Sequence, residues 1–295
     1  MAKSNSERQL KIAWVRHLVQ LICLFIFIWP LISTAWGLFG VTLGTGDGNT
    51  YNTPASLPFY GSLSSSTIFG IITLDPFATI EVTAATKSLS DICLIGIIPV
   101  LLVYGLIRGR AFCAWVCPVN LLLEITDVVR DKLGIKISEN PIPRHTKIYI
   151  AIIVVALSAL LSFPVFEAIS PLSAINKGIL FGSLTGTLLL IAIVIANLFW
   201  AKHTWCRSLC PLGGFWELIG KVGLVNVKLK HDACIQCSAC KHACLADPAI
   251  LDDALAKNTS VVGAGDCMAC GACVDACPTH ALSLYVGKGE LKENA

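Results

Sequence analysis

Eight cysteines near the C-terminal end carry the strongest chemical signal in the sequence. They form two runs with the same spacing, which comprise Cys234, Cys237, Cys240 and Cys244, then Cys267, Cys270, Cys273 and Cys277. In bacterial ferredoxins this run supplies three thiolates to one 4Fe-4S cluster, and its fourth cysteine reaches the other cluster. The spacing therefore predicts one cluster held by Cys234, Cys237, Cys240 and Cys277, and a second held by Cys267, Cys270, Cys273 and Cys244.

Other uses of these eight cysteines fit the spacing less well. Structural zinc sites take four ligands per ion and usually pair them two by two across a longer gap. Disulfides are rare in the cytoplasm, where the orientation derived below places this segment. Leu245 replaces the proline expected after the fourth cysteine of the first run, a change that bears on the reduction potential more than on ligation. The segment is thus predicted to transfer single electrons.

Four more cysteines form two matched pairs, Cys113 with Cys117 and Cys206 with Cys210. Each pair is followed by a proline, and a spacing of four residues puts both sulfurs on one helix face or one turn. Three interpretations remain open: the four thiolates ligate a further metal centre, each pair is a redox-active dithiol, or the motif is a structural turn. The four are candidate redox residues.

These pairs belong to an internal repeat. The segments around Pro76 and Pro118 are echoed around Pro171 and Pro211, at offsets of 95 and 93 residues. A nearly fixed offset with the same order of motifs indicates a duplicated unit. Such a unit would place both cysteine pairs at one surface, facing each other across a pseudo-two-fold axis.

The elements that must position these cysteines are predicted from composition. Of 295 residues, 55% are hydrophobic and only 14% charged, which is typical of a membrane protein. Apolar runs near the roughly 20 residues that a membrane-spanning helix needs predict four spans, at about 18–39, 89–107, 148–166 and 178–200. The predicted fold is a four-helix membrane domain over residues 1–225, followed by a two-cluster ferredoxin domain of α+β class over residues 226–295.

The basic residues predict the orientation. Lys and Arg gather before the first span, between the second and third, and after the fourth, as the positive-inside rule requires of cytoplasmic segments. Both termini, and the cysteine-rich domain, are therefore expected on the cytoplasmic side of a bacterial inner membrane. A net charge of only +3 without a basic stripe argues against nucleic-acid binding.

Titratable side chains near the predicted membrane edges are weaker candidates. His17, His145 and His203 could accept a proton from a quinol, or be solvated or packed. The carboxylates of the outer side, those of Asp75, Glu81 and Glu167, could relay protons, although solvated loop carboxylates are the commoner case.

Taken together, these motifs resemble the NapH family, the ferredoxin-type membrane subunits of periplasmic nitrate reductase systems. The likeness covers nearly the whole chain and rests on Asp75-Pro76, on Phe112-Cys-Ala-Trp-Val-Cys-Pro118, on Trp205-Cys-Arg-Ser-Leu-Cys-Pro211 and on both ferredoxin runs. It implies a component of a quinol dehydrogenase, with ubiquinol or menaquinol as donor. For Cys113, Cys117, Cys206 and Cys210 it implies partner-contact or redox roles. It also implies as partners the periplasmic ferredoxin-type subunit NapG and a membrane-anchored multihaem cytochrome.

The resulting prediction is a membrane-bound iron–sulfur electron-transfer subunit that takes part in quinol oxidation for nitrate respiration. The alternative is an accessory reductase for the maturation of a respiratory metalloenzyme. Copper handling fits poorly, because Met and His clusters are missing from the sequence.

Overall fold

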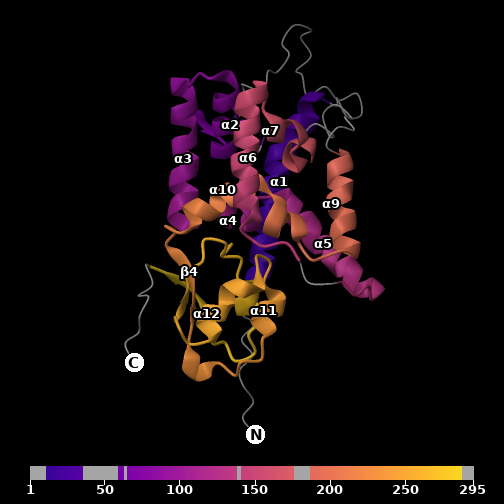
Figure 1. The fold of residues 1–295 in the computed structure, drawn as a ribbon, viewed down its shortest axis with the longest axis vertical. Coiled ribbons are helices and arrows are strands. Elements are labelled where there is room, and N and C mark those ends of the chain that lie inside the picture. Colours follow the sequence, from indigo (N-terminus) through magenta and orange to yellow (C-terminus); the bar gives the residue numbers. More distant parts are fainter. Residues whose placement is uncertain (1–10, 36–58, 63–64, 138–140, 176–186, 288–295) are drawn as a thin grey trace.

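A computed structural model describes residues 11–35, 59–62, 65–137, 141–175 and 187–287 (Figure 1). Helices make up the upper part, which we call the helical domain and which ends at Leu224. Below it lies a smaller α+β unit that begins at Val225, the C-terminal domain (Figure 1).

The helical domain contains long helices and short connecting ones. Its helices are α1 (Ile12–Ala35), α2 (Pro76–Thr86), α3 (Asp91–Ile107), α4 (Ala111–Trp115), α5 (Pro118–Leu133), α6 (Thr146–Leu161), α7 (Val165–Ile169), α9 (Thr187–Phe199), the π-helical turn η3 (Trp205–Leu209) and α10 (Pro211–Gly220). An antiparallel sheet precedes α2 and is formed in the order β1 (Phe59–Gly61), β2 (Ser65–Ile68) and β3 (Ile71–Leu74). Asp75 caps α2, because its side chain accepts a hydrogen bond of 2.9 Å from the backbone N–H of Phe77.

The C-terminal domain is built on a second antiparallel sheet. Its strands are β4 (Val225–Leu229), β5 (Val261–Val262) and β6 (Leu282–Val286), in the order β5-β4-β6. Short helical turns connect them: η4 (His231–Ala233), α11 (Ala239–Ala243), η5 (Pro248–Leu251), α12 (Asp252–Leu255) and α13 (Ala272–Asp275). The core of this domain gathers cysteines of both ferredoxin runs around Val227, Leu251 and Met268.

The prediction of four membrane-spanning helices is not supported. Among the residues that the structure describes, no helix is both long enough and apolar enough to cross a membrane. Helices α3, α6 and α9 have 17, 16 and 13 residues, against the roughly 20 that hydrocarbon requires. The backbone conformation ends two of these helices: Arg108 is extended after α3, and Ser162 is in the left-handed region after α6. The first and fourth predicted spans also include residues 36–39 and 178–186, which lie outside the described residues.

The two cysteine-pair motifs share their backbone geometry. Cys117 and Cys210 are the N-caps of α5 and α10, with φ/ψ angles of −66°/119° and −70°/113°. The proline after each cysteine is the first residue of the helix, a position that suits it because a first-turn N–H has no partner within the helix. The prolines therefore start helices instead of only ending turns. The duplicates differ before the cap, where α4 is α-helical and η3 is π-helical.

Candidate metal centres

The eight cysteines of the C-terminal domain line two separate cavities. One, here called the outer cavity, is lined by Cys234, Cys237, Cys240 and Cys277. The other, the inner cavity, is lined by Cys244, Cys267, Cys270 and Cys273. These are the two ligand sets that the sequence predicts, with the fourth cysteine of each run exchanged. The thiols present at each cavity therefore fit one 4Fe-4S cluster each.

The two cavities differ in their electrostatic setting. Burial raises the pKa of Cys244, at the inner cavity, to about 12. Burial also acts to raise the pKa of Cys277, but hydrogen bonds from Thr279 and from the backbone N–H groups of Ala281 and Leu282 outweigh it and lower that pKa. Iron would deprotonate both thiols on binding, at a higher cost for Cys244.

The two cysteine pairs of the helical domain meet in a third cavity. Cys113, Cys117, Cys206 and Cys210 all line it, together with Phe112, Asn120, Leu172 and Trp205, and we call it the junction cavity. Its wall is mainly apolar, and the side chain of Cys206 is buried. Burial raises the pKa of both Cys117 and Cys210 to about 12. Four thiols from the two halves of the repeat thus converge on one enclosed space.

Buried arginines connect the junction cavity to the inner cavity. Arg110 donates a hydrogen bond of 2.7 Å to the carbonyl of Cys206 and another of 2.8 Å to the carboxylate of Asp266, the residue before Cys267. Arg207, which follows Cys206, donates to the carbonyl of Cys244 at 3.0 Å. Hydrogen bonds of these two arginine side chains therefore connect the backbone around the junction cavity with the backbone around the inner cavity.

An aromatic side chain makes a further link. The indole N–H of Trp115, between Cys113 and Cys117, donates to the carbonyl of Ala269 at 3.2 Å, and Ala269 lies between Cys267 and Cys270. Cys113 also packs against the hydrophobic cores of both domains. Residues of both halves of the repeat thus hold the junction cavity next to the inner cavity.

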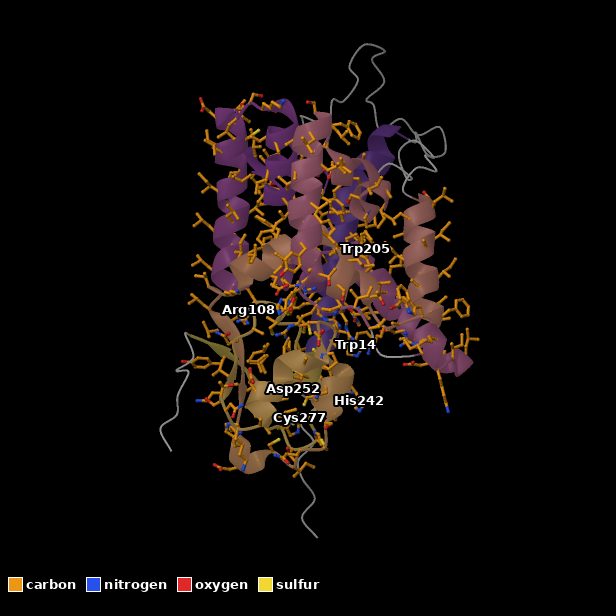
Figure 2. All side chains as sticks on the ribbon, viewed as in Figure 1. Trp14, Arg108, Trp205, His242, Asp252 and Cys277 are labelled. Carbon is orange, nitrogen blue, oxygen red and sulfur yellow. The ribbon has the colours of Figure 1, made fainter. Side chains whose placement is uncertain are left out.

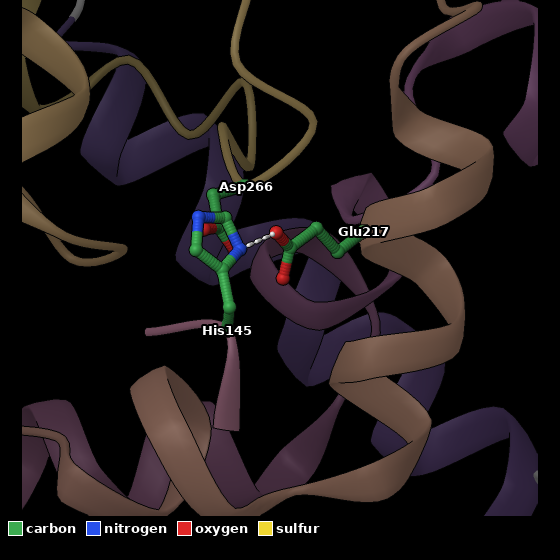
Figure 3. Close-up of side chains that lie close together, drawn as sticks. All are labelled: His145, Glu217 and Asp266. Carbon is green, nitrogen blue, oxygen red and sulfur yellow. Dashed lines mark hydrogen bonds and ion pairs between the residues drawn. The ribbon is translucent and has the colours of Figure 1, made fainter. Parts of the chain in front are cut away.

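A cluster of titratable groups lies at the same junction. The side chains of His145, Glu217 and Asp266 come together there, with His145 Nδ1 2.8 Å from Glu217 Oε1 (Figure 3). Their ligand atoms lie close enough to hold a metal ion. However, the ammonium of Lys147, which is fully buried, lies 3.1 Å from Glu217 and forms an ion pair with Asp266 as well. This lysine neutralises the carboxylates, so we interpret the cluster as an ion-pair network that joins α6, α10 and the C-terminal domain.

The other predicted candidates have structural partners. His17 lies 3.0 Å from Glu124, and His203 is buried 2.8 Å from Asp127. The carboxylate of Glu81 accepts hydrogen bonds from the Ser158 hydroxyl and from backbone N–H groups. These contacts place the three side chains in packing networks.

Sequence reasoning missed the residues that join the cavities. In the sequence, Arg110, Lys147 and Arg207 are three of the basic residues that flank the predicted membrane spans, and no role is predicted for Asp266. One signal was available, because Arg207 lies inside a cysteine motif and Asp266 immediately precedes another. Their partners, however, are far away in the sequence, and no spacing rule indicates them.

Known protein families match the segments that contain the cysteines of the three cavities. A family model described as a 4Fe-4S binding domain matches residues 92–136 and, again, residues 183–230, which include the two cysteine pairs. A 4Fe-4S dicluster domain matches residues 226–278. Fold, thiol sets and family models together define an iron–sulfur electron-transfer protein of the ferredoxin type.

Curated relatives narrow this class. The ferredoxin-type protein NapH of Haemophilus influenzae is 32% identical over 74% of this chain and 77% of its own length. NapH of Escherichia coli is 28% identical over 90% of this chain and 88% of its own. The methylamine utilization ferredoxin-type protein MauN of Methylorubrum extorquens is 31% identical over 76% and 78%. The chain belongs to this family of NapH-like ferredoxin-type proteins. No solved structure matches it.

Proposed function

We propose that this protein takes electrons from a membrane quinol and passes them through three iron–sulfur centres, the first of them held by Cys113, Cys117, Cys206 and Cys210. The observation that carries the proposal is the convergence of these four thiols in one cavity, joined by Arg110 and Arg207 to the backbone of the inner cavity. Iron–sulfur clusters supply one-electron chemistry when bound.

The arrangement of the cysteine pairs favours a shared metal centre over two redox-active dithiols. A dithiol of the thioredoxin kind needs a thiol of lowered pKa and access for a partner thiol. Here the thiols line an enclosed apolar cavity, and burial raises the pKa of Cys117 and Cys210. The 4Fe-4S family model that covers both pairs supports the same cofactor at this cavity.

Exposed apolar side chains of the helical domain support a place in the bacterial inner membrane. The cytoplasmic side that we propose for the C-terminal domain rests on the distribution of Lys and Arg in the sequence. Large apolar side chains are exposed along α3, α6 and α9, among them Ile95, Leu102, Ile153, Leu160, Leu188 and Phe199. Contiguous exposed apolar surface of this kind marks contact with a membrane or another protein. Lipid contact also brings the domain to the phase in which long-chain quinols are dissolved.

The acceptor side of the proposal rests on the relatives. NapH and MauN are named for different systems, and identity to the two is similar. We assign this chain to nitrate respiration because NapH of Escherichia coli matches most of its length. NapG and a membrane-anchored multihaem cytochrome are then the expected partners towards the nitrate reductase.

Iron content and cluster spectra test the junction centre. The full chain, purified anaerobically in mild detergent, should hold about 12 iron atoms if three cubanes are present and about 8 if only two are. Cys113→Ser and Cys206→Ser should each lose about four of these, with one cluster signal missing from the EPR spectrum of the dithionite-reduced protein. Cys93→Ser is the matched control, since Cys93 lines none of the three cavities.

Short-chain quinols then test the donor. Ubiquinol or menaquinol should reduce the clusters of the parent protein, and Cys206→Ser should abolish this while dithionite still reduces the remaining clusters. If dithionite reduces all clusters and neither quinol does, the quinol donor is wrong. A parent protein with only about 8 iron atoms would exclude the third centre.

A further inference from the structure

A large cavity lies in the helical domain next to the junction cavity. Its volume is about 420 Å³, within the range of sites that enclose small organic ligands. Its lining comes from α1, the β2–β3 hairpin, α3 and α10, and most of it is apolar, including Ile26, Pro99, Val100 and Trp216. We call it the apolar cavity. None of the thiol sets described above accounts for it.

A few polar residues line the apolar cavity. Asp75, Tyr104, Ser66 and Thr73 are among its lining residues. The two hydroxyls of Ser66 and Thr73 lie 2.7 Å apart and hydrogen-bond to each other. Asp75 uses one carboxylate oxygen to cap α2, which fixes the position of the group at the cavity wall. A mainly apolar space with one fixed carboxylate and a phenol suits a ring that carries hydroxyl groups and an apolar tail.

Only a thin wall separates the apolar cavity from the junction cavity. Phe112 lines both cavities, and Val116 lines the apolar cavity between Cys113 and Cys117. The ring of Phe112 also contacts Tyr104 and Trp216, with ring centroids 5.6 and 6.5 Å apart. A molecule in the apolar cavity would therefore be separated from the junction cavity at Phe112 by a single side chain.

Some of the lining residues also reach the outer surface. Phe69 is 76% exposed and Val103 is 51% exposed, and both line the cavity. Val103 lies on α3, which carries much of the exposed apolar surface described above. The cavity is thus open on an apolar side, where a ligand dissolved in lipid could enter.

We infer that the apolar cavity is the binding site of the quinol, with its head group at Asp75 and Tyr104 and its isoprenoid tail leaving past Phe69 and Val103. This inference rests on the proposed function and gives the donor a location. In the reaction the hydroquinone loses two electrons and two protons and becomes the quinone. The two electrons would leave one at a time, each reducing an oxidised iron–sulfur centre by one electron, and Asp75 would accept the two protons in turn and release each to solvent.

Cavity-blocking variants of the full chain test the site. In Val100→Trp a bulky ring fills the cavity, and Val103→Trp narrows it from a second position. Leu102→Trp is the matched control, because Leu102 lies on the same helix, is 57% exposed and does not line the cavity. Asp75→Asn retains a side chain that can cap α2 but removes the carboxylate.

The measurements are equilibrium binding of tritiated short-chain ubiquinone and menaquinone to the oxidised protein, the rate of cluster reduction by the quinols, and iron content as a check on folding. We expect both blocking variants to bind the quinone at least about tenfold more weakly, with Leu102→Trp unchanged. Asp75→Asn should bind within about threefold of the parent, and its clusters should be reduced at least about tenfold more slowly.

The outcomes separate the site from the proposed function. Blocking variants that contain full iron and bind quinone like the parent would overturn the site, even if quinol reduces the parent clusters. A parent protein that binds no quinone would overturn it too. If the parent binds quinone, the blocking variants do not, and quinol reduces no cluster, the site stands and the quinol-donor function fails. An unchanged reduction rate in Asp75→Asn would remove that carboxylate as proton acceptor.

Discussion

Buried cationic side chains link the helical domain to the C-terminal domain. Arg108, Arg110 and Lys147 are almost completely buried, and each reaches from the helical domain to the C-terminal domain. A buried cation is tolerated only with close partners, which these three find in carboxylates and backbone carbonyls. Their role was not predictable from the sequence, because a basic residue near an apolar run looks the same whether it faces headgroups or a protein partner.

At the residue scale, Lys147 gives the first prediction. Lys147→Met leaves Glu217 and Asp266 without their shared cation, and removing one partner of a buried ion pair costs about 3–5 kcal/mol. We expect the free energy of unfolding to fall clearly. Unfolding in detergent, monitored by near-ultraviolet circular dichroism, measures this change. The double variant Lys147→Met/Glu217→Gln should recover part of the loss, and a double variant as unstable as the single one would contradict the ion-pair explanation.

The buried pair His203 and Asp127 gives a pH prediction. Burial lowers the pKa of His203 although Asp127 opposes it, and hydrogen bonds from His203 and Asn197 outweigh burial and hold the pKa of Asp127 at about 2. Both folded-state pKa values lie below the unfolded ones, so the folded state binds fewer protons, and stability rises as the pH rises and falls as the pH falls. The His203 contribution is complete above about pH 6.5 and is lost below it, whereas that of Asp127 is lost only between about pH 3.9 and 2.

We therefore expect the parent protein to lose stability between pH 7.5 and 5.5 through His203, because its pKa is lower in the folded state than in the unfolded chain. Thermal unfolding at the two pH values measures this loss. His203→Asn should show a smaller loss, because asparagine tolerates the left-handed backbone there and does not titrate. His280→Asn is the control, since His280 also has a positive φ but is exposed. Equal losses in the parent and His203→Asn would exclude the buried histidine as the cause.

At the scale of elements, close packing of α10 fixes the second cysteine pair. A Cβ atom at Gly214 would lie 2.5 Å from the carbonyl oxygen of Lys147 on α6, whereas one at Gly213 would meet nothing nearer than 3.6 Å. The repeat itself was readable from the sequence, because its motifs recur at an almost constant offset. The short π-helical turn before Cys210 was not predictable, since nothing in the sequence of Trp205–Leu209 indicates a helix type different from that of α4.

The neighbouring glycines of α10 make a matched pair. Gly214→Ala should destabilise the protein by about 1–3 kcal/mol, because the methyl group forces α10 away from α6. Gly213→Ala should be neutral or stabilising by up to about 1 kcal/mol through helix propensity. Thermal unfolding of both variants distinguishes them. If the two alanine variants have the same stability, the close approach of the helices does not limit α10.

At the scale of the whole molecule, one side chain anchors the C-terminal sheet to the end of α3. Arg108, at the junction of the two domains in Figure 2, donates to the Asn226 side chain, to the carbonyl of Ala264 at 2.5 Å and to that of Val262 at 3.4 Å. The grouping of the eight cysteines at two cavities follows from their spacing, which brings the first three cysteines of each run to one cavity. The docking of the domains and the apolar cavity were not predictable, because residues more than a hundred positions apart create them.

Arg108→Met should loosen this docking while leaving both domains folded. Four acceptors of the C-terminal domain lose their donor, so we expect hydrogen exchange around Val262 and Ala264 to speed up by at least about tenfold. Lys136→Met, at an exposed position on the helical domain, is the control. Exchange at the same rate in the arginine variant and the parent would show that other contacts dominate the docking.

The junction cavity also has a consequence for biosynthesis. Its two cysteine pairs are 93 residues apart in the chain, so a ribosome adding about 5–20 residues per second exposes the second pair at least several seconds after the first. During that interval Cys113 and Cys117 have no counterpart, and a centre with four protein thiols cannot close. Loading of the proposed centre is therefore confined to the time after both halves of the repeat have been made and have met.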